Sequence, residues 1–343
     1  MNSKKIIYSL GIILLVVLAI IVSEQLSNRE PPEQQLRFFP GITESSIFAV
    51  KISEHDSRLK LSREGNEWYV QSVSETQKTP PDAFSEETGT TDSPKYLTDS
   101  ASVEVALEKI VNLRKSMLVS ENPDRQAAFE VDSESGIFID VFDNSGSSLG
   151  AVRIGKNAAG FNSHYVRQIG SNSVYSVPGG VRFSFFTDID RWRNRTVISF
   201  GRDLAYRISV NGENGSEYTL QKSSDGWRVV APIEHYANQD AVVEIISTLS
   251  NLVAVDFENE MTSYDSLRLA QPKLTVSIDL TDGTQRKIIV GGKNEHEQHW
   301  TLAENRNDIF LISDSDFEQI SRELDHLKGE EPQIAELTQE SEE

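Results

Sequence analysis

The same pattern of residues occurs twice in this chain, and this repetition limits the folds open to it more than any other feature does. Residues 48–53 (FAVKIS) resemble 204–209 (LAYRIS), and the turn 155–157 (GKN) has an identical copy at 292–294. Further pairs follow in the same order: Leu59 and Leu61 with Tyr218 and Leu220, Trp68 with Trp227, Asn112 with Asn251, Asn122 with Asn259, Gly146 with Gly283, His164 with His299, and Tyr175 with Phe310. An ordered series of this kind indicates a duplicated structural unit.

The spacing between corresponding residues is nearly constant except across 72–99, which are polar, acidic and rich in turn-forming residues. That composition is typical of an inserted surface loop. We therefore predict a first repeat over 37–200, with the insert inside it, and a second repeat over 201–328. The acidic tail 329–343 is predicted to be disordered.

The hydrophobic period changes type within each repeat. Alternation over 48–52 and 204–210 predicts strands, and the turns 143–146 (DNSG) and 281–283 (TDG) predict hairpins. Apolar stripes at helical spacing follow, namely Val103, Leu107 and Ile110 in the first repeat and Val242, Ile245, Ile246, Leu249 and Leu252 in the second. Asn238 is expected to cap the second of these helices. Asp314 is expected to cap a last helix, with inward residues Phe317, Ile320, Leu324 and Leu327. We predict an α+β fold in which each repeat is a mainly antiparallel sheet with one or two packed helices.

The N-terminus predicts a membrane anchor. Residues 6–22 are uncharged and almost wholly apolar, and as a helix they would be roughly 26 Å long, close to the ~30 Å hydrocarbon core. Two lysines precede this stretch, so residues 1–5 are expected in the cytoplasm and the rest of the chain outside it. The alternative is a cleaved signal peptide, which exports the chain equally. Residues 23–36, which include Pro31 and Pro32, are expected to be a polar spacer.

Charge and composition narrow the function. Acidic residues outnumber basic ones 53 to 33, which gives a net charge of −20, and such a field opposes binding of nucleic acid through a broad basic face. The chain has no cysteine, which excludes disulfides, thiolate metal sites and cysteine nucleophiles. Phosphate loops, dinucleotide fingerprints and nucleophile elbows are missing as well. We therefore expect no catalytic residues, no cofactor and no metal, and predict that the protein is not an enzyme.

Aromatic residues and arginines are the candidate binding residues. Four aromatic residues at matching positions could stack on a sugar or peptide, although such residues are more often core: Trp68, Trp227, Tyr165 and Trp300. Arg191, Arg193 and Arg195 form a dense basic cluster between the two predicted repeats. They could hold a carboxylate of a partner. The alternative is internal pairing with the nearby acids Asp188, Asp190 and Asp203.

Histidines are the remaining candidates for chemistry. His296 and His299 are three residues apart, a spacing that resembles a metal pair but falls between two predicted strands rather than on a helix. We interpret this segment as a polar hairpin loop. The first repeat has His164 at the matching place without a second histidine. A hydrolase that uses His164 or His299 is the weakest functional hypothesis.

Several local motifs resemble those of the bacterial domain-of-unknown-function family 4340 over about 37–328. They are 39–41 (FPG) before the first strand, 226–227 (GW), 119–123 (VSENP), the Asp-Gly hairpin and the Gly-Lys-Asn turn. The first repeat departs from the family pattern at 132–134 (DSE), where prolines commonly open the strand that follows the helix. The resemblance implies an exported, membrane-tethered protein, often encoded beside ABC-type transporters of the gliding-motility auxiliary kind. It implies no catalytic residues.

These observations favour a non-catalytic accessory or scaffold protein in the cell envelope. It would be anchored in the bacterial cytoplasmic membrane by a single span, with the bulk of the chain periplasmic or extracytoplasmic. The expected partners are the membrane and another envelope protein, such as an ABC transporter component. The second hypothesis is a binding module for a ligand or polymer, which would need aromatic and polar side chains that converge on a concave surface.

Overall fold

The computed structural model describes residues 36–73, 93–160, 162–213, 216–259 and 263–330. Its internal contacts divide the chain into two units. The first consists of 1–66, 72–91 and 101–188, and the second of 67–71, 92–100 and 189–343. The predicted anchor at 6–22, most of the spacer, the middle of the insert and nearly all of the acidic tail lie outside the described residues. Among the residues that are described, no helix has the length and apolar character needed to span a membrane.

Nine strands form the first sheet, in the order β4-β3-β2-β1-β6-β7-β8-β9-β5. They are β1 (Ala49–Glu54), β2 (Ser57–Glu64), β3 (Glu67–Ser72), β4 (Tyr96–Leu97), β5 (Met117–Ser120), β6 (Ile137–Phe142), β7 (Ser148–Asn157), β8 (Ser163–Gln168) and β9 (Val174–Pro178). Helix α2 (Ser100–Val111) lies between β4 and β5 in the sequence, and the 3-10 helix η5 (Val181–Ser184) follows β9.

Nine strands also form the second large sheet, in the order β14-β13-β12-β11-β17-β18-β19-β20-β16. They are β11 (Ala205–Gly212), β12 (Glu217–Ser223), β13 (Gly226–Ala231), β14 (His235–Tyr236), β16 (Asp256–Phe257), β17 (Leu274–Leu280), β18 (Gln285–Lys293), β19 (His299–Ala303) and β20 (Phe310–Ile312). The helices are α3 (Gln239–Leu249), α4 (Asp314–Ile320) and the 3-10 helix η8 (Leu324–Leu327). A separate two-stranded sheet joins β10 (Thr196–Ser199) to β15 (Asn251–Val253).

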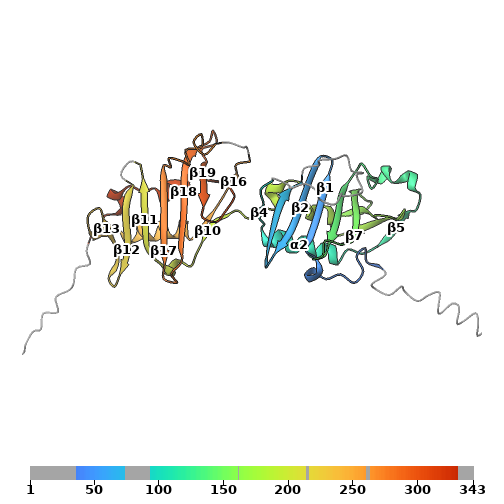
Figure 1. Cartoon of the computed structure of the whole chain (residues 1–343), viewed down its shortest axis with the longest axis horizontal. Coiled ribbons are helices and arrows are strands. Elements are labelled where there is room, and N and C mark those ends of the chain that lie inside the picture. Colours follow the sequence, from blue (N-terminus) through green and yellow to red (C-terminus); the bar gives the residue numbers. More distant parts are fainter. Residues whose placement is uncertain (1–35, 74–92, 161, 214–215, 260–262, 331–343) are drawn as a thin grey trace, which may run out of the picture. The chain divides into compact units, whose positions relative to one another are not determined.

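The two nine-stranded sheets are built in the same way. Each begins with a four-strand meander whose last strand is short, continues after a helix with a second four-strand meander, and ends with a short edge strand that comes from between these two groups in the sequence (Figure 1). The strand pairs for which a register is given are all antiparallel. The predicted α+β class, with mainly antiparallel sheets, is therefore confirmed.

The apolar patterns of the sequence account for the core. Along β17 every second residue is buried, because side chains of a strand alternate between its two faces. The predicted stripe of α3 is buried from Val242 to Leu249. Leu252, which was expected to continue it, is buried as well but belongs to β15, because the helix ends at Leu249. The side chain of Asn238 accepts a hydrogen bond from the backbone N–H of Ala241, so the predicted cap is confirmed.

Two expectations about the ends of elements were wrong. Ser313, not Asp314, caps the last helix, because its hydroxyl accepts a hydrogen bond from the N–H of Asp316. That helix also ends at Ile320, and Leu324 begins the separate helix η8. In addition, Tyr96 and Leu97 form β4 inside the predicted insert and pair with β3, as β14 pairs with β13.

Candidate functional site

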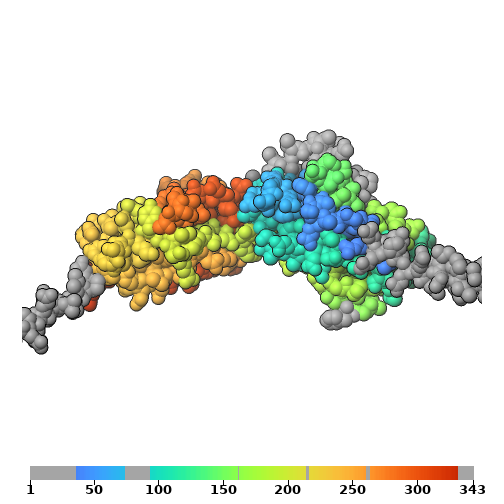
Figure 2. All heavy atoms as spheres, turned by 90° about the horizontal axis from the view of Figure 1, so that it is seen from below, coloured from blue at the N-terminus to red at the C-terminus, as the bar shows by residue number. Residues whose placement is uncertain are grey.

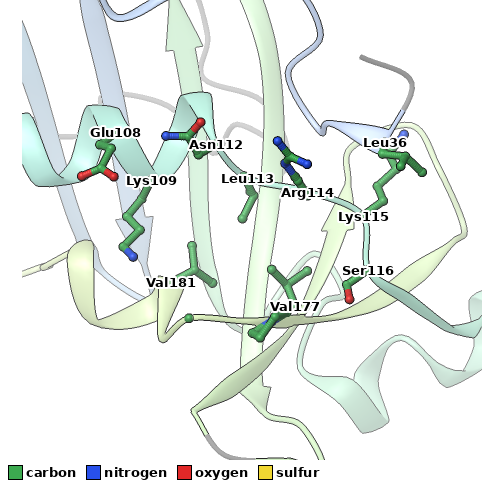
Figure 3. Close-up of a pocket in the computed structure, with 12 residues that line it drawn as sticks. Leu36, Glu108, Lys109, Asn112, Leu113, Arg114, Lys115, Ser116, Val177 and Val181 are labelled. Atoms are coloured by element: carbon green, nitrogen blue, oxygen red, sulfur yellow. The ribbon is translucent and has the colours of Figure 1, made fainter. Parts of the chain in front are cut away.

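A groove lies between the C-terminal end of α2 and the segment that follows β9. It has a volume of about 360 Å³. We name it the α2–η5 groove; Figure 3 shows its lining residues: Leu36, Glu108, Lys109, Asn112, Leu113, Arg114, Lys115, Ser116, Val177, Pro178, Gly179 and Val181. All of them belong to the first unit, and α2 with the chain after it forms part of that unit's exposed surface (Figure 2, teal).

The groove owes its shape to three residues at the end of β9 and directly after it. Pro178 is followed by Gly179 and Gly180, which have φ of +94° and +63°. This left-handed backbone is open to glycine but cannot continue a right-handed helix. The chain therefore makes only the four-residue helix η5 at this point, and Val181 at its start lines the groove.

The floor of the groove is apolar and its rim is basic. Leu113, Val177 and Val181 are at most 5% exposed and form the floor. Lys109 and Lys115 lie on the rim; Arg114 and Glu108 also line the groove. Because the chain as a whole carries a charge of −20, this local excess of cations is a distinct feature of its surface.

The C-terminal end of α2 is secured from outside the helix. The Nη1 atom of Arg37 donates a hydrogen bond of 2.8 Å to the carbonyl oxygen of Val111. Backbone bonds join Phe38 N–H to Leu113 and Lys115 N–H to Leu36. A cation at this place satisfies one of the last carbonyls of the helix and complements its dipole. The wall that carries Lys109 and Lys115 is therefore tied to residues 36–38 by hydrogen bonds.

The predicted arginine cluster is divided between buried and exposed positions. Arg193 is 2% exposed, and its guanidinium lies 3.8 Å from the ring centroid of Tyr96 and 3.7 Å from that of Phe257. It forms ion pairs of 2.8 Å with Asp308 and 2.9 Å with Asp190. All these residues lie in the second unit. Arg193 is thus an internal residue, as the alternative interpretation of this cluster held.

Asp308 is the centre of this network. Its carboxylate is fully buried and also forms an ion pair of 2.8 Å with Arg306. Arg306 in turn donates to the carbonyl oxygens of Asn194 and Thr196. Arg191 is exposed, and Arg195 is half-buried and donates to the carbonyl oxygen of Val255. A pocket of about 400 Å³ borders the cluster and is lined by Asp99, Asp190, Arg191, Arg193, Asn194, Arg195, Thr196 and Val253.

The two matching histidines are buried in strands. His299 begins β19 and is 2% exposed, and its Nε2 lies 2.9 Å from Asp314. Its ring stacks on Phe317 with a centroid distance of 3.9 Å. The interpretation of 296–299 as a loop therefore holds for the exposed His296 and is wrong for His299. Burial lowers the pKa of His299, and the hydrogen bond to Asp314 opposes that effect.

His164 has the same place in the first repeat without the acceptor. It is fully buried next to Phe183, at a centroid distance of 5.1 Å. Neither of its ring nitrogens has a hydrogen-bond partner among the described residues. Burial lowers the pKa of His164, and the positive charge of Arg182 lowers it further. Both histidines are thus neutral residues of the fold at neutral pH.

The four predicted aromatic residues lie at separate places. Trp227 is 7% exposed and belongs to the core of the second unit. Trp300 is half-buried and donates a 2.9 Å hydrogen bond from Nε1 to Glu258. Tyr165 is half-buried and packs on Phe129, and Trp68 is half-buried in β3. None of the four lines the α2–η5 groove.

The domain-of-unknown-function family DUF4340 matches residues 89–267 and again 227–338, so its model covers more than half of the chain in two overlapping regions. The chain belongs to the DUF4340 family. No curated protein matches the sequence. The family resemblance and the tandem copies noted in the sequence are therefore confirmed, and the DUF4340 description names no activity.

Sequence reasoning missed the groove of this DUF4340 protein. The signal was present in 178–180 (PGG), which contrasts with 313–314 (SD) at the corresponding place of the second repeat. Lys109 lies in the helix α2 and Lys115 lies after it. Neither was singled out from the sequence, because single lysines at such positions are ordinary surface residues. Within the described ranges no group of three His, Cys, Asp or Glu could hold a metal ion.

Proposed function

We propose that this DUF4340 protein is a membrane-anchored, extracytoplasmic accessory protein that binds another envelope protein and catalyses no reaction. The partner we propose is a component of an ABC-type transporter complex. The α2–η5 groove carries this proposal, because it is an open surface with an apolar floor and a basic rim. The buried candidate residues Arg193, His164 and His299 instead contribute to the fold itself.

The use of those residues inside the fold supports a binding role. Arg193 is enclosed by two aromatic rings and two carboxylates. His299 and His164 are at most 2% exposed and contact aromatic rings, so they offer little accessible surface to a substrate. The groove and its cationic rim, by contrast, are open at the surface of the part of the chain that the structure describes.

The N-terminal sequence supports the anchored location. Residues 6–22 are long and apolar enough for a span, and the spacer ends at Leu36, which lines the groove. The first repeat would therefore be tied to the membrane through a short connection, and the groove would lie near the point of attachment. A membrane-integral partner is accessible from such a position.

A second candidate is a binding module for a small ligand. The groove volume of about 360 Å³ falls within the ~300–1,000 Å³ of typical ligand pockets. Its rim would select an anion with an apolar part. The absence of a stacking aromatic residue from the lining makes a sugar a poorer fit than an acidic group.

The experiment is affinity purification of the full-length chain from detergent-solubilised membranes of its native host. We expect the chain in the membrane fraction, digestible by protease added to spheroplasts, and co-purified with a transporter subunit identified by mass spectrometry. A variant that lacks residues 6–22 should be lost from the membrane fraction. Recovery of the full-length chain from the cytosol, or purification without any envelope protein, would contradict the proposal.

A further inference from the structure

We infer that the α2–η5 groove binds an acidic amphipathic helix that belongs to the partner protein. This inference rests on the proposed function, because that function supplies the partner. It adds the place on this chain and the chemistry of the segment that docks there.

The second repeat shows what occupies the corresponding place. There, α4 begins directly after β20 and packs against α3. Ile320 of α4 is fully buried in the core, and Phe317 packs against the same core. Arg322, just after α4, forms an ion pair with Glu244 of α3. The fold thus has a position beside its main helix that accepts a short helix with an apolar face.

The first repeat fills this position only in part: Phe183 contacts His164, and Phe185, at the place of Ile320, is 3% exposed, but η5 is shorter than α4. Pro178, Gly179 and Gly180 replace the capping Ser313 and its successor, so no helix starts after β9 until η5. The surface that a longer helix would cover lies open as the groove, with Val177 and Val181 on its floor. In Figure 3, Lys109 extends from α2 towards the segment that carries Val181, across the opening.

Charge selects the kind of helix. The first turn of α4 is acidic, with Asp314 and Asp316, and it starts where the groove has glycine. Lys109 and Lys115 stand on the rim of the groove. A docked helix with carboxylates in its first turns would place them near these ammonium groups, and opposite charges at a rim steer association and fix orientation. Apolar residues on its inner face would cover the floor, as in other helix-in-groove complexes.

The binding experiment uses a fluorescein-labelled peptide with the sequence of residues 313–328, because this segment contains α4. Anisotropy is measured with the full-length chain in nanodiscs of zwitterionic phosphatidylcholine. We expect saturable binding that weakens as salt is raised. The double variant K109E/K115E should weaken it about tenfold or more, equivalent to about 1.4 kcal/mol.

Two controls separate the groove from general electrostatics. Lys222→Glu changes an exposed lysine of β12 and should alter the affinity less than twofold. A peptide in which the residues matching Phe317 and Ile320 are serine keeps its charge and should not bind. Equal binding by K109E/K115E and the parent chain, or equal binding of the two peptides, would overturn the inference.

Two further measurements complete the test. Flotation with vesicles that contain anionic phosphatidylglycerol tests whether the groove binds a membrane surface instead of a helix. If binding of the chain to these vesicles depends on Lys109 and Lys115, and binding of the peptide does not, the inference is overturned. Co-purification of the transporter subunit is then repeated with K109E/K115E. If the subunit is retained, the groove is not its docking site and the proposed function stands; if the parent chain recovers none, the proposed function itself fails.

Discussion

The two repeats have the same order of strands but differ in the segment that follows the last long meander, after β20 and after β9. After β20, Ser313 caps α4, and that helix brings Phe317 onto His299 and Asp314 to its Nε2. After β9, Pro178 and two glycines with positive φ delay the helix. Phe183 then contacts His164 but is 63% exposed, and the ring nitrogens of His164 have no described partner.

This comparison teaches how a duplicated fold can acquire a binding surface. The second repeat completes its own core with a capped helix. The first repeat keeps the same strand order, but a change of a few residues at one helix start leaves an apolar floor open between basic side chains. Local capping chemistry, rather than the sheet, therefore distinguishes the two repeats at this place, and under the proposed function it decides which repeat is available to a partner.

The turn before β20 also differs from the corresponding turn before β9. In the second repeat Asp308 is buried between Arg193 and Arg306. In the first repeat the corresponding residue is Ser173, whose hydroxyl makes a 3.4 Å contact with the exposed Glu121. At this turn the second repeat therefore has a buried ionic network, whereas Ser173 in the first repeat makes an exposed polar contact.

The largest loss of stability is expected from a substitution that breaks this ionic network. Asp308→Ala removes one carboxylate from two arginines, and leaving a buried charge uncompensated typically costs about 3–5 kcal/mol. Hydrogen exchange should show lower protection across β19 and β20 and little change in β1 and β2. The matched change Ser173→Ala should stay within about 0.5 kcal/mol in the free energy of unfolding. Similar losses from both variants would contradict the contrast.

The starts of the two terminal helices give the next effects. Gly180→Ala places a Cβ in left-handed backbone and 2.5 Å from Asn162 Nδ2, so we expect a loss of about 1–2 kcal/mol. Ser313→Ala removes the cap of α4 and should cost about 1 kcal/mol. Denaturant titration measures both, and an unchanged midpoint for Gly180→Ala would show that the glycine is not needed there.

Acid sensitivity sharpens the comparison of the histidines. Both have a pKa below the ordinary value of 6.5 in the fold, so each is neutral when folded and gains a proton more readily when unfolded. Their contribution to stability is complete above about pH 6.5 and is lost as the pH falls below it. The pH dependence of unfolding should be shallower in His164→Gln, and Asp314→Ala should make it steeper because His299 loses an opposing interaction. If the slope of the unfolding free energy against pH is unchanged in both variants, this account of the two histidines is refuted.

The smallest effect is expected at the groove. Lys109→Glu changes a partly exposed side chain without a core role, so the free energy of unfolding should change by no more than about 0.5 kcal/mol. Thermal unfolding of the full-length chain measures this. A loss of several kcal/mol would mean that Lys109 supports the fold rather than a partner.

Much of the fold could be read from the sequence because its patterns are local. Alternation predicted the strands, and the apolar stripe of α3 and its cap Asn238 were confirmed. The ion pair of Arg193 with Asp308 could not be found in this way, because these residues are far apart in the sequence and Asp308 stands in an ordinary polar turn. The groove was missed for a related reason: the helix that follows β9 is short, and the lining of the groove comes from three separate segments.

Site-specific crosslinking in cells tests the central claim most directly. The chain has no cysteine, so Ser116→Cys on the groove and Ser224→Cys in the exposed β12–β13 turn each provide a single thiol. The account predicts that Ser116→Cys forms a crosslink to an acidic helical segment of one transporter subunit, identified by mass spectrometry of the joined peptides, and that Ser224→Cys does not. Crosslinks of equal yield to that subunit from both positions, or none from Ser116→Cys, would contradict it.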